Sequence, residues 1–452
     1  MSAPGVCQGA WGDSGELEMM AMTDQSGLTW LRSLQRFGIK PGLERTIRVL
    51  DGLNHPEQSL RFLHIAGTNG KGSVCANLTS LFSQTMRVGT FTSPAFDGYR
   101  ARFEVAGEQI TEYDLEQFAS QVRSVWQYTM PSEPLTEFEA LTLIALLFFQ
   151  QQGAQVVVWE TGLGGRYDST NIVLPEVTAI TNVSYDHIDI LGPTLRHIAI
   201  NKAGIAKPGV PMVTAAQDVG LRVIERAVAA KGSPLWVKGK EFDGTGWVNN
   251  QGEQIFTYRG HDFDLVGLTL PLFGPHQVEN ATVSLAVYEA ARQERRVPEL
   301  TPTQLRSGME QVRWPGRFER LWVGKVPVVL DGAHNEEGAR RLAQSLMEYG
   351  QQLNIHGGWV MVTGILHDKR AMEMMRWVLP LARVVICTAP ASSRAEAPEV
   401  LAAEAGLLTS APLRIVSGVA EAMDEALHYR SPVCCWGSLY TVNEARQAIN
   451  QT

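Results

Sequence analysis

The sequence contains few cysteines, and their arrangement suits neither a disulfide framework nor a zinc site. Its 452 residues include five cysteines, an odd number with one adjacent pair and no Cys-X-X-Cys motif. Disulfide-rich secreted domains and structural zinc sites depend on paired, regularly spaced cysteines. We therefore expect a protein of the reducing cytoplasm.

Long apolar runs and an excess of positive charge are also missing. The longest apolar run, at residues 143–149, is far shorter than the ~20 residues that span a bilayer. The 39 Lys and Arg against 47 Asp and Glu give a net charge of −8, which disfavours general nucleic-acid binding. We expect neither a membrane nor a nucleic acid as partner. Residues 1–24 show no basic region followed by an apolar stretch, so we expect a loose extension there rather than a targeting signal.

The length and the alternation of segment types indicate two α/β domains, which we place at residues 25–312 and 313–452. In the first, strand-like and helical segments alternate, which predicts a P-loop-type, mostly parallel sheet with helices on both faces. Residues 235–272 have period-two stretches and turn residues, which predict a small antiparallel element. The second has strand-like segments separated by helices, which predicts a smaller, Rossmann-like α/β domain.

A glycine-rich stretch, HIAGTNGKGS at residues 64–73, lies between a strand-like and a helical segment. In this context backbone N–H groups at a helix N-terminus can hold a phosphate. Lys71 would add a full positive charge, and Gly70 and Gly72 would let the N–H groups converge. However, Lys71 is not followed directly by Ser or Thr, so the common Walker pattern is not met. From the residues alone, a phosphate site and an ordinary glycine turn stay equally open.

Further motifs follow in order between about residues 28 and 445. They are FGIKPGLERTIRVLDGL, LHIAGTNGKGSV, FTSP, LTEFEALTLIA, ETGLGGRYDSTN, YDHIDILGPTLRHIAINKAGIAKPG, GPHQVENATVSLA, WPGRFE, LDGAHN, TGILHDK and WGSLYTV. The ordered set resembles the folylpolyglutamate synthase/dihydrofolate synthase family of the Mur ligase superfamily.

This resemblance implies an ATP-dependent amide ligase that adds L-glutamate to dihydropteroate, to (poly)glutamylated reduced folates, or to both. ATP would phosphorylate a carboxylate, and the amine of glutamate would then displace phosphate from the acyl phosphate. The implied cofactors are ATP, two magnesium ions and a carbamylated lysine at Lys202, and a monovalent cation such as K⁺ is a further candidate. We expect small-molecule partners only, and a monomer.

The resemblance also implies roles for individual residues. Nucleotide contacts are expected from Gly70, Lys71, Gly72, Ser73, Asn280, Arg317 and Asp331. The expected magnesium ligands are Ser93, Glu160 and His187. The expected catalytic residues are Glu160, Lys202 and His334. Contacts with the acceptor acid or the incoming glutamate are expected from Thr136, Glu137, Phe138, Glu139, Tyr167 and Ser438.

Several of these residues also allow purely structural interpretations. Glu160 could cap the following glycine turn or pair with Arg166. Lys202 could be an ordinary lysine on a helix surface. Asn280 could be a helix N-cap, and Phe138 a core aromatic at the start of an apolar helix.

Two stretches depart from the family's usual pattern. Ala95 and Phe96 stand where His-Leu is usual, and Ala101 stands where the glutamate of a Glu-Arg-Ile sequence is usual. Tyr167 replaces a smaller aliphatic residue. These changes put the identity of the acceptor acid in question more than the type of reaction. Two alternatives therefore remain, a related ligase with a different acid acceptor and a non-catalytic ATP-binding switch.

Overall fold

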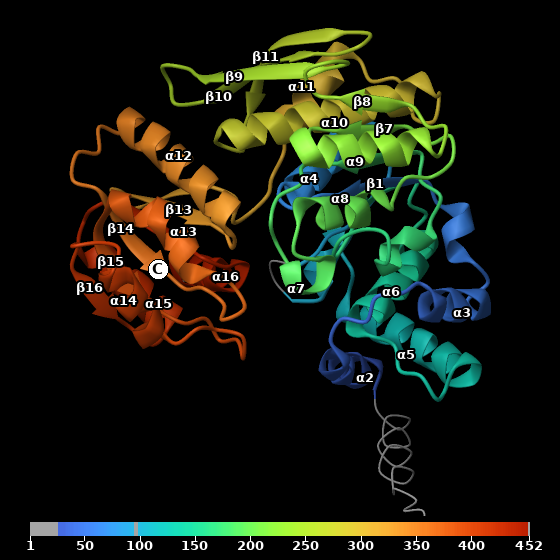
Figure 1. Cartoon of the computed structure of the whole chain (residues 1–452), viewed down its shortest axis with the longest axis horizontal. Helices are drawn as coiled ribbons and strands as arrows, with labels where there is room; N and C mark the ends of the chain where they lie inside the picture. The colour runs from blue at the N-terminus through green and yellow to red at the C-terminus, as the bar shows by residue number, and fades with distance from the viewer. Residues whose placement is uncertain (1–25, 95–97, 451–452) are drawn as a thin grey trace, which may run out of the picture.

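The computed structural model describes residues 26–94 and 98–450. Two lobes lie side by side, an N-terminal one coloured blue to yellow and a C-terminal one coloured orange to red (Figure 1). The predicted extension at residues 1–24 and the sequence departures Ala95 and Phe96 lie outside the described residues.

The N-terminal lobe is built on an eight-stranded sheet with the strand order β4-β3-β2-β5-β1-β6-β7-β8. The six strands from β2 to β8 in this order are parallel, and β3 and β4 add an antiparallel edge. The strands are β1 (Phe62–Ala66), β2 (Val88–Phe91), β3 (Phe103–Val105), β4 (Glu108–Gln109), β5 (Val156–Glu160), β6 (Val177–Ile180), β7 (Met212–Thr214) and β8 (Leu235–Val237).

Helices cover both faces of this sheet because its central strands are apolar on both sides. In β1, Phe62 packs with the helices of one face and Leu63 with those of the other. The first face carries α2 (Gly27–Ser33), α3 (Glu44–Gly52), α5 (Glu112–Thr129), α6 (Glu137–Gln151), α8 (Leu195–Ala203) and α9 (Asp218–Ala229). The second carries α4 (Lys71–Phe82), α10 (Pro275–Gln293) and α11 (Pro302–Glu310). The short α7 (Ile188–Leu191) precedes α8.

A three-stranded antiparallel sheet packs on the second face, at the top of Figure 1. Its strands are β9 (Asp243–Val248), β10 (Gln254–Arg259) and β11 (Asp264–Leu270). The antiparallel element predicted at residues 235–272 is therefore present, but its first part was assigned wrongly. Residues 235–237 form β8, which pairs in parallel with β7. Trp236 and Val237 are buried there, and the neighbouring apolar strand selects this pairing.

The C-terminal lobe has a six-stranded sheet with the order β12-β13-β17-β14-β15-β16, parallel except for β12. Its strands are β12 (Glu319–Val323), β13 (Val326–Asp331), β14 (Trp359–Thr363), β15 (Ala382–Cys387), β16 (Leu413–Ile415) and β17 (Val433–Trp436). One face packs against α12 (Glu336–Gln352), α13 (Ala371–Val378) and α14 (Pro398–Gly406), and the other against α15 (Val419–His428) and α16 (Leu439–Asn450).

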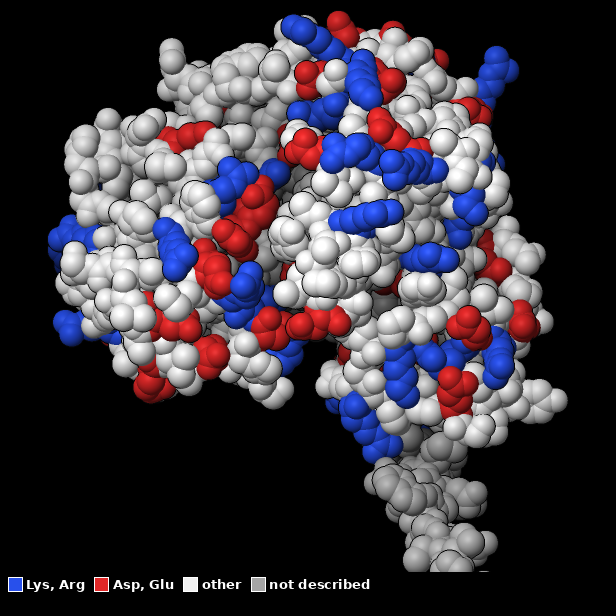
Figure 2. Space-filling model, viewed as in Figure 1, with Lys and Arg blue, Asp and Glu red and all other residues white. Residues whose placement is uncertain are grey.

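The expected fold class, two α/β units of unequal size, agrees with this architecture. The described residues also form five short 3₁₀ helices: η1 (Leu34–Phe37), η2 (Pro56–Ser59), η3 (Arg100–Arg102), η4 (Ser169–Ile172) and η5 (Leu379–Leu381). Among the described helices, none combines the length and the apolar character that a bilayer crossing needs. Charges of both signs border the groove between the two lobes (Figure 2).

Candidate active site

The glycine-rich loop leads from the carboxyl end of β1 into α4. Gly70 precedes the helix with φ = 84°, a conformation that favours glycine, and a Cβ there would lie 2.3 Å from the Asn280 side-chain oxygen. A Cβ on Gly72 would lie 2.6 Å from the ring of Trp314. The Lys71 ammonium donates to the carbonyls of Gly67 at 3.2 Å and Thr68 at 3.4 Å. The loop therefore presents helix N–H groups and a cation at one point, which favours an anion.

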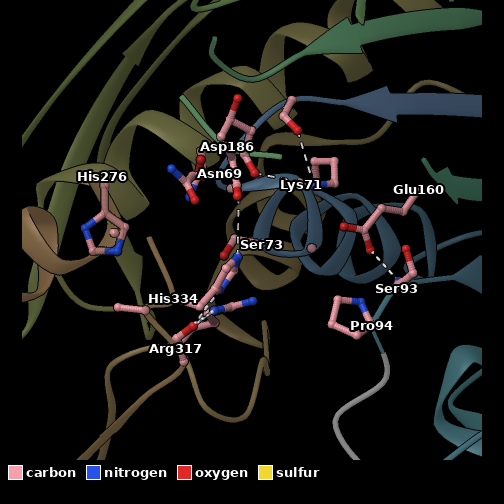
Figure 3. Close-up of a pocket in the computed structure, with 18 of the residues that line it drawn as sticks. Asn69, Lys71, Ser73, Ser93, Pro94, Glu160, Asp186, His276, Arg317 and His334 are labelled. Carbon is pink, nitrogen blue, oxygen red and sulfur yellow. Dashed lines mark hydrogen bonds and ion pairs between the residues drawn. The ribbon is translucent and has the colours of Figure 1, made fainter. Parts of the chain in front are cut away.

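This loop lines a cavity of about 150 Å³ that includes residues of both lobes (Figure 3). The cavity brings together all twelve residues that the sequence analysis linked to nucleotide, metal or catalysis, apart from the substrate contacts. They are Gly70, Lys71, Gly72, Ser73, Ser93, Glu160, His187, Lys202, Asn280, Arg317, Asp331 and His334. These residues are separated by up to 264 positions in sequence, so only the folded chain can assemble them.

Glu160 ends β5 and is 3% exposed. One of its carboxylate oxygens accepts a hydrogen bond from the Ser93 backbone N–H at 2.9 Å (Figure 3). Burial raises the pKa of Glu160 to about 7, although Lys71 and the Ser93 N–H act in the opposite direction. Arg166 stacks over Tyr167 instead, so the interpretation of Glu160 as its ion-pair partner is wrong.

Lys202 lies in the last turn of α8 and is 3% exposed. The interpretation as an ordinary surface lysine is therefore wrong. Burial, followed by repulsion from Lys71, lowers the pKa of Lys202 to about 7. Its side chain consequently has a large neutral fraction near neutral pH.

His187 precedes α7 in a left-handed conformation, with φ = 49°. Its neighbour Asp186 contacts the C-terminal lobe, because it accepts hydrogen bonds from Asn335 at 3.0 Å and Lys369 at 3.2 Å. Burial opposes ionisation of this carboxyl, but His187 and other nearby cations lower the pKa of Asp186. Asn335 also exchanges hydrogen bonds with Asn69 at 2.9 and 3.3 Å.

The sequence analysis missed these four contact residues as site residues. Asp186 and Asn335 lie next to the selected residues His187 and His334, Asn69 lies inside the glycine loop, and Lys369 lies in the quoted motif TGILHDK. Nothing in the local pattern separates them from their neighbours. Only the meeting of the two lobes shows their role.

Three residues of the C-terminal lobe line the far wall. Both carboxylate oxygens of Asp331 accept backbone N–H groups, from Phe318 at 2.8 Å and Ala333 at 2.9 Å. Arg317 donates to the Gly332 carbonyl at 3.1 Å. Burial lowers the pKa of His334 to about 4, so its ring is neutral near pH 7.

Asn280 occupies the interior of α10 rather than its N-cap, so the capping interpretation is wrong. Its amide nitrogen donates to the Gln277 side chain at 3.1 Å. The side chain is almost fully buried and still lines the cavity beside the glycine loop.

A second cavity of about 490 Å³ adjoins the first and shares Ser93, Pro94, His187 and His334 with it. Five of the six expected substrate contacts line this cavity: Thr136, Phe138, Glu139, Tyr167 and Ser438. Glu137 does not line it. Its carboxylate instead accepts from Tyr99 and from Gln35.

The start of α6 explains how Thr136 and Glu139 are held. They form a reciprocal capping box, and the Glu139 carboxylate also pairs with Arg45 at 2.8 Å. Phe138 packs against the core, 5.8 Å from the Phe91 ring centre, and also lines the cavity. The core and substrate interpretations of Phe138 are therefore compatible.

The matches to known protein families agree with the division into two lobes. The Mur ligase middle domain matches residues 65–288, and the Mur ligase glutamate ligase domain matches residues 316–433. The Dihydrofolate synthase/folylpolyglutamate synthase of Bacillus subtilis is 36% identical over 371 residues, which cover 80% of this chain and 84% of that protein. The chain belongs to the folylpolyglutamate synthase/dihydrofolate synthase family.

As a member of the Mur ligases, the chain is an enzyme of the ligase class. The Escherichia coli FolC structure in complex with DHPP and ADP superimposes with a TM-score of 0.82 and 28% identity, over 95% of this chain and 99% of that one. A probable bifunctional folylpolyglutamate synthase/dihydropteroate synthase of Haloferax volcanii is 34% identical over 439 residues. The present ligase spans about half the length of that relative, 50%, while 94% of its own residues match.

Proposed function

We propose that this ligase adds L-glutamate, with ATP as the energy source, to dihydropteroate, to (poly)glutamylated reduced folates, or to both. The observation that carries the proposal is the pair of adjoining cavities. The smaller presents cations and helix N–H groups suited to a triphosphate. The larger presents mainly apolar surface, with polar and charged groups between, which suits an acid with a flat ring system. The two cavities share walls where a carboxylate could meet a phosphate. Relatives named for this reaction, and the complex with DHPP and ADP, support the assignment.

The chemistry follows from where charge develops. An oxygen of the acceptor carboxylate attacks the γ-phosphorus of ATP, the bond to the β-phosphate oxygen breaks, and ADP leaves. Lys71, Arg317 and the first N–H groups of α4 would stabilise the negative charge of the transferring group. The amine of glutamate then attacks the acyl carbon and phosphate departs. Enclosure between the lobes would limit the access of water, which could otherwise hydrolyse the acyl phosphate.

The residues around Glu160 fit a magnesium ion. Within the described residues no group of three or more His, Cys, Asp or Glu could hold a metal alone. Magnesium commonly binds through one or two carboxylates together with substrate phosphates and water. We assign Glu160, Ser93 and His187 to this ion, with a second ion and K⁺ as further parts of the proposal. When bound, the ion would offset the charge of the phosphates.

Lys202 is assigned as a carbamate. Carbon dioxide adds to a neutral amine with loss of one proton and converts a cation into an anion. The lowered pKa of Lys202 supplies the neutral amine that this reaction needs. A negative side chain beside Lys71 and the magnesium ligands would also remove the repulsion that the ammonium now meets.

The acceptor is assigned to the larger cavity. Thr136, Phe138 and Tyr167 would contact its flat ring system, with Phe138 presenting an aromatic surface. Glu137 and Glu139 would act indirectly, because their carboxylates already bind protein groups. His334 and Ser438 would position the incoming glutamate. Asn280 and Asp331 would contact the nucleoside.

The domain boundary, the location in the cell and the oligomeric state belong to the same proposal. We place the division between the two units at residues 312 and 313, in the segment that joins α11 to β12. We further propose that the ligase acts as a cytoplasmic monomer. Neither choice affects the chemistry above.

The test is ADP formation with ATP, magnesium and L-glutamate, in the presence of dihydropteroate, tetrahydrofolate or neither acid. Mass spectrometry of the products should show the acid heavier by one glutamyl residue. ADP formation that needs neither acid would instead identify an ATP-driven switch. A requirement for some other acid would identify a divergent ligase.

A further inference from the structure

Arg102 ends η3 and lines the larger cavity. Its side chain makes no hydrogen bond or ion pair with any residue in the described ranges, and its Nε atom is buried without a partner. Arginine heads enclosed in this way are normally paired, because an uncompensated guanidinium loses its hydration. The position therefore calls for an anion that is not part of the chain.

The carboxylate that acts most strongly on Arg102 is already bound elsewhere. Glu137 accepts a short hydrogen bond from the Tyr99 hydroxyl and a second bond from Gln35 at 2.8 Å. Burial lowers the pKa of Arg102, and among the carboxylates that oppose this effect Glu137 acts more strongly than Glu160. Arg102 thus lies within the field of Glu137 without forming a direct pair.

The other lysine and arginine side chains on the described part of this cavity wall are either paired or exposed to solvent. Lys40 is exposed, and its ammonium lies over the Phe37 ring. Arg394 binds both carboxylate oxygens of Asp368 at 2.8 Å, and Lys369 binds Asp186 at 3.2 Å. The one glutamate on this wall, Glu139, is held by Arg45. Among the described residues of the wall, Arg102 therefore stands out as a cation with an unused binding fork.

The location of Arg102 determines which carboxylate it can take. It lines the larger cavity but not the smaller one, where Lys71 and the α4 N-terminus receive phosphate. The carboxylate that becomes phosphorylated must reach the smaller cavity. A carboxylate at Arg102 is thus a different one on the same acceptor.

We propose that Arg102 binds a second, non-reacting carboxylate of acceptors that end in a glutamyl residue, and that it sets the preference for such acceptors over acids with a single carboxylate. This inference rests on the proposed function and deepens it. Tetrahydrofolate carries both a reacting γ-carboxylate and a non-reacting α-carboxylate, whereas dihydropteroate carries one carboxylate. Arginine suits this role because its planar fork matches a carboxylate in two parallel hydrogen bonds.

The test compares Arg102→Gln, Arg102→Lys and the native enzyme with both acceptors. For Arg102→Gln, KM for tetrahydrofolate should rise about tenfold or more, as expected for the loss of a charge-assisted hydrogen bond. Its kcat, and its KM for dihydropteroate, should change by less than about twofold. The KM of Arg102→Lys for tetrahydrofolate should lie between those of the native enzyme and Arg102→Gln, since lysine keeps the charge but not the planar fork.

Arg100→Gln is the matched control. Arg100 lies in the same 3₁₀ helix, donates to the Ile110 carbonyl at 2.8 Å and lines neither cavity. The Arg100→Gln variant should leave the ratio of KM for tetrahydrofolate to KM for dihydropteroate unchanged. Equal effects of Arg102→Gln on both acids, or no effect on either, would overturn the inference.

Equilibrium binding separates this inference from the proposed function. The affinity of tetrahydrofolate and of dihydropteroate is measured by fluorescence with a non-hydrolysable ATP analogue present. Should the native enzyme bind both acids but turn over neither, the proposed function fails. A selective, about tenfold loss of tetrahydrofolate affinity in Arg102→Gln would still support the role of Arg102, and an unselective loss would refute it.

Discussion

Lys202 shows how burial changes the chemistry of a common side chain. Sequence alone favoured a surface lysine, because nothing in its helix marks it as enclosed. In the structure it is buried beside Lys71, and its pKa falls to about 7. An amine that is partly neutral at physiological pH can react with carbon dioxide, whereas an ordinary lysine with a pKa near 10.4 is almost entirely protonated.

The first prediction concerns this residue. Lys202→Ala should lower kcat about 100-fold, in the range seen when a group supporting a metal site is removed. Acetate or formate should restore part of the activity, because a small carboxylate can replace the missing carbamate. Lys207→Ala is the control, since Lys207 binds the Asn171 carbonyl away from both cavities. Full activity of Lys202→Ala without added acid would refute the carbamate.

His64 is a second residue whose state is set by its surroundings. It is fully buried in β1, its Nε2 donates to the Thr170 hydroxyl at 3.0 Å, and its Nδ1 has no partner among the described residues. Burial, reinforced by Lys207, lowers the pKa of His64 to about 3. The folded protein thus keeps His64 neutral at a pH where the unfolded chain, with a pKa of about 6.5, takes up a proton.

This difference predicts a pH dependence of stability. The contribution of neutral His64 is fully present above about pH 6.5 and is lost as pH falls towards 3. Between pH 7.5 and pH 5 it should reduce the free energy of unfolding by about 2 kcal/mol. His64→Gln keeps a donor for Thr170 but does not titrate. Measured by urea unfolding, the decrease in its free energy of unfolding between pH 7.5 and pH 5 should be smaller than that of the native protein by this amount. Identical losses in both proteins would show that His64 does not titrate in this way.

At the scale of single elements, α6 combines structure with substrate contact. Its N-cap Thr136 and its third residue Glu139 exchange side-chain and backbone hydrogen bonds, and both line the larger cavity. The same capping box, formed by Thr301 and Gln304, begins α11 away from both cavities. The two helix starts therefore form a natural comparison.

Removal of each cap should have the same structural effect but different functional effects. Thr136→Ala and Thr301→Ala should each lower the free energy of unfolding by about 1 kcal/mol. Only Thr136→Ala should raise KM for the acceptor, by several-fold, because the N-terminus of α6 then shifts within the cavity wall. Thermal unfolding and steady-state kinetics check both statements. A similar KM change in Thr301→Ala would assign the effect to general destabilisation.

The elements that could be predicted from sequence are those with a strong apolar pattern. The segments on either side of the glycine loop, which form β1 and α4, and the apolar helix α6 were predicted from their sequence. The hairpin β3-β4 was not predicted, because its strands are only three and two residues long. These short strands form because they pair at the edge of the sheet, and no pattern in their own sequence indicates this pairing. β8 is likewise only three residues long, and its own sequence does not show that it pairs in parallel with β7 rather than within the antiparallel sheet.

At the scale of the whole molecule, the site depends on contacts between the two lobes. Asp186 and Asn69 of the N-terminal lobe meet Asn335 and Lys369 of the C-terminal lobe. The order of the motifs could predict a site between two domains, and the smaller cavity collects the expected residues. It could not identify these bridging groups, because no sequence pattern encodes how two folded units face each other.

The interface leads to a further prediction. Asn335 caps α12 by accepting from the Gly338 N–H at 2.8 Å, and Asp can replace this cap. Asn335→Asp would however lose the amide donors to Asn69 and Asp186 and place two carboxylates together. We expect KM for ATP to rise about tenfold and the radius of gyration in solution scattering to increase, with thermal unfolding nearly unchanged. An unaltered KM would mean that these contacts do not hold the lobes together during catalysis.

The central claim, transfer of phosphate to the acceptor carboxylate in the cavity between the lobes, can be tested by isotope transfer. Dihydropteroate or tetrahydrofolate labelled with ¹⁸O in the reacting carboxylate is incubated with ATP, magnesium and L-glutamate. Attack by that carboxylate on the γ-phosphorus leaves one labelled oxygen on phosphorus after the amine displaces it. The released phosphate should therefore carry one ¹⁸O for each amide formed. Unlabelled phosphate accompanying amide formation would contradict the account.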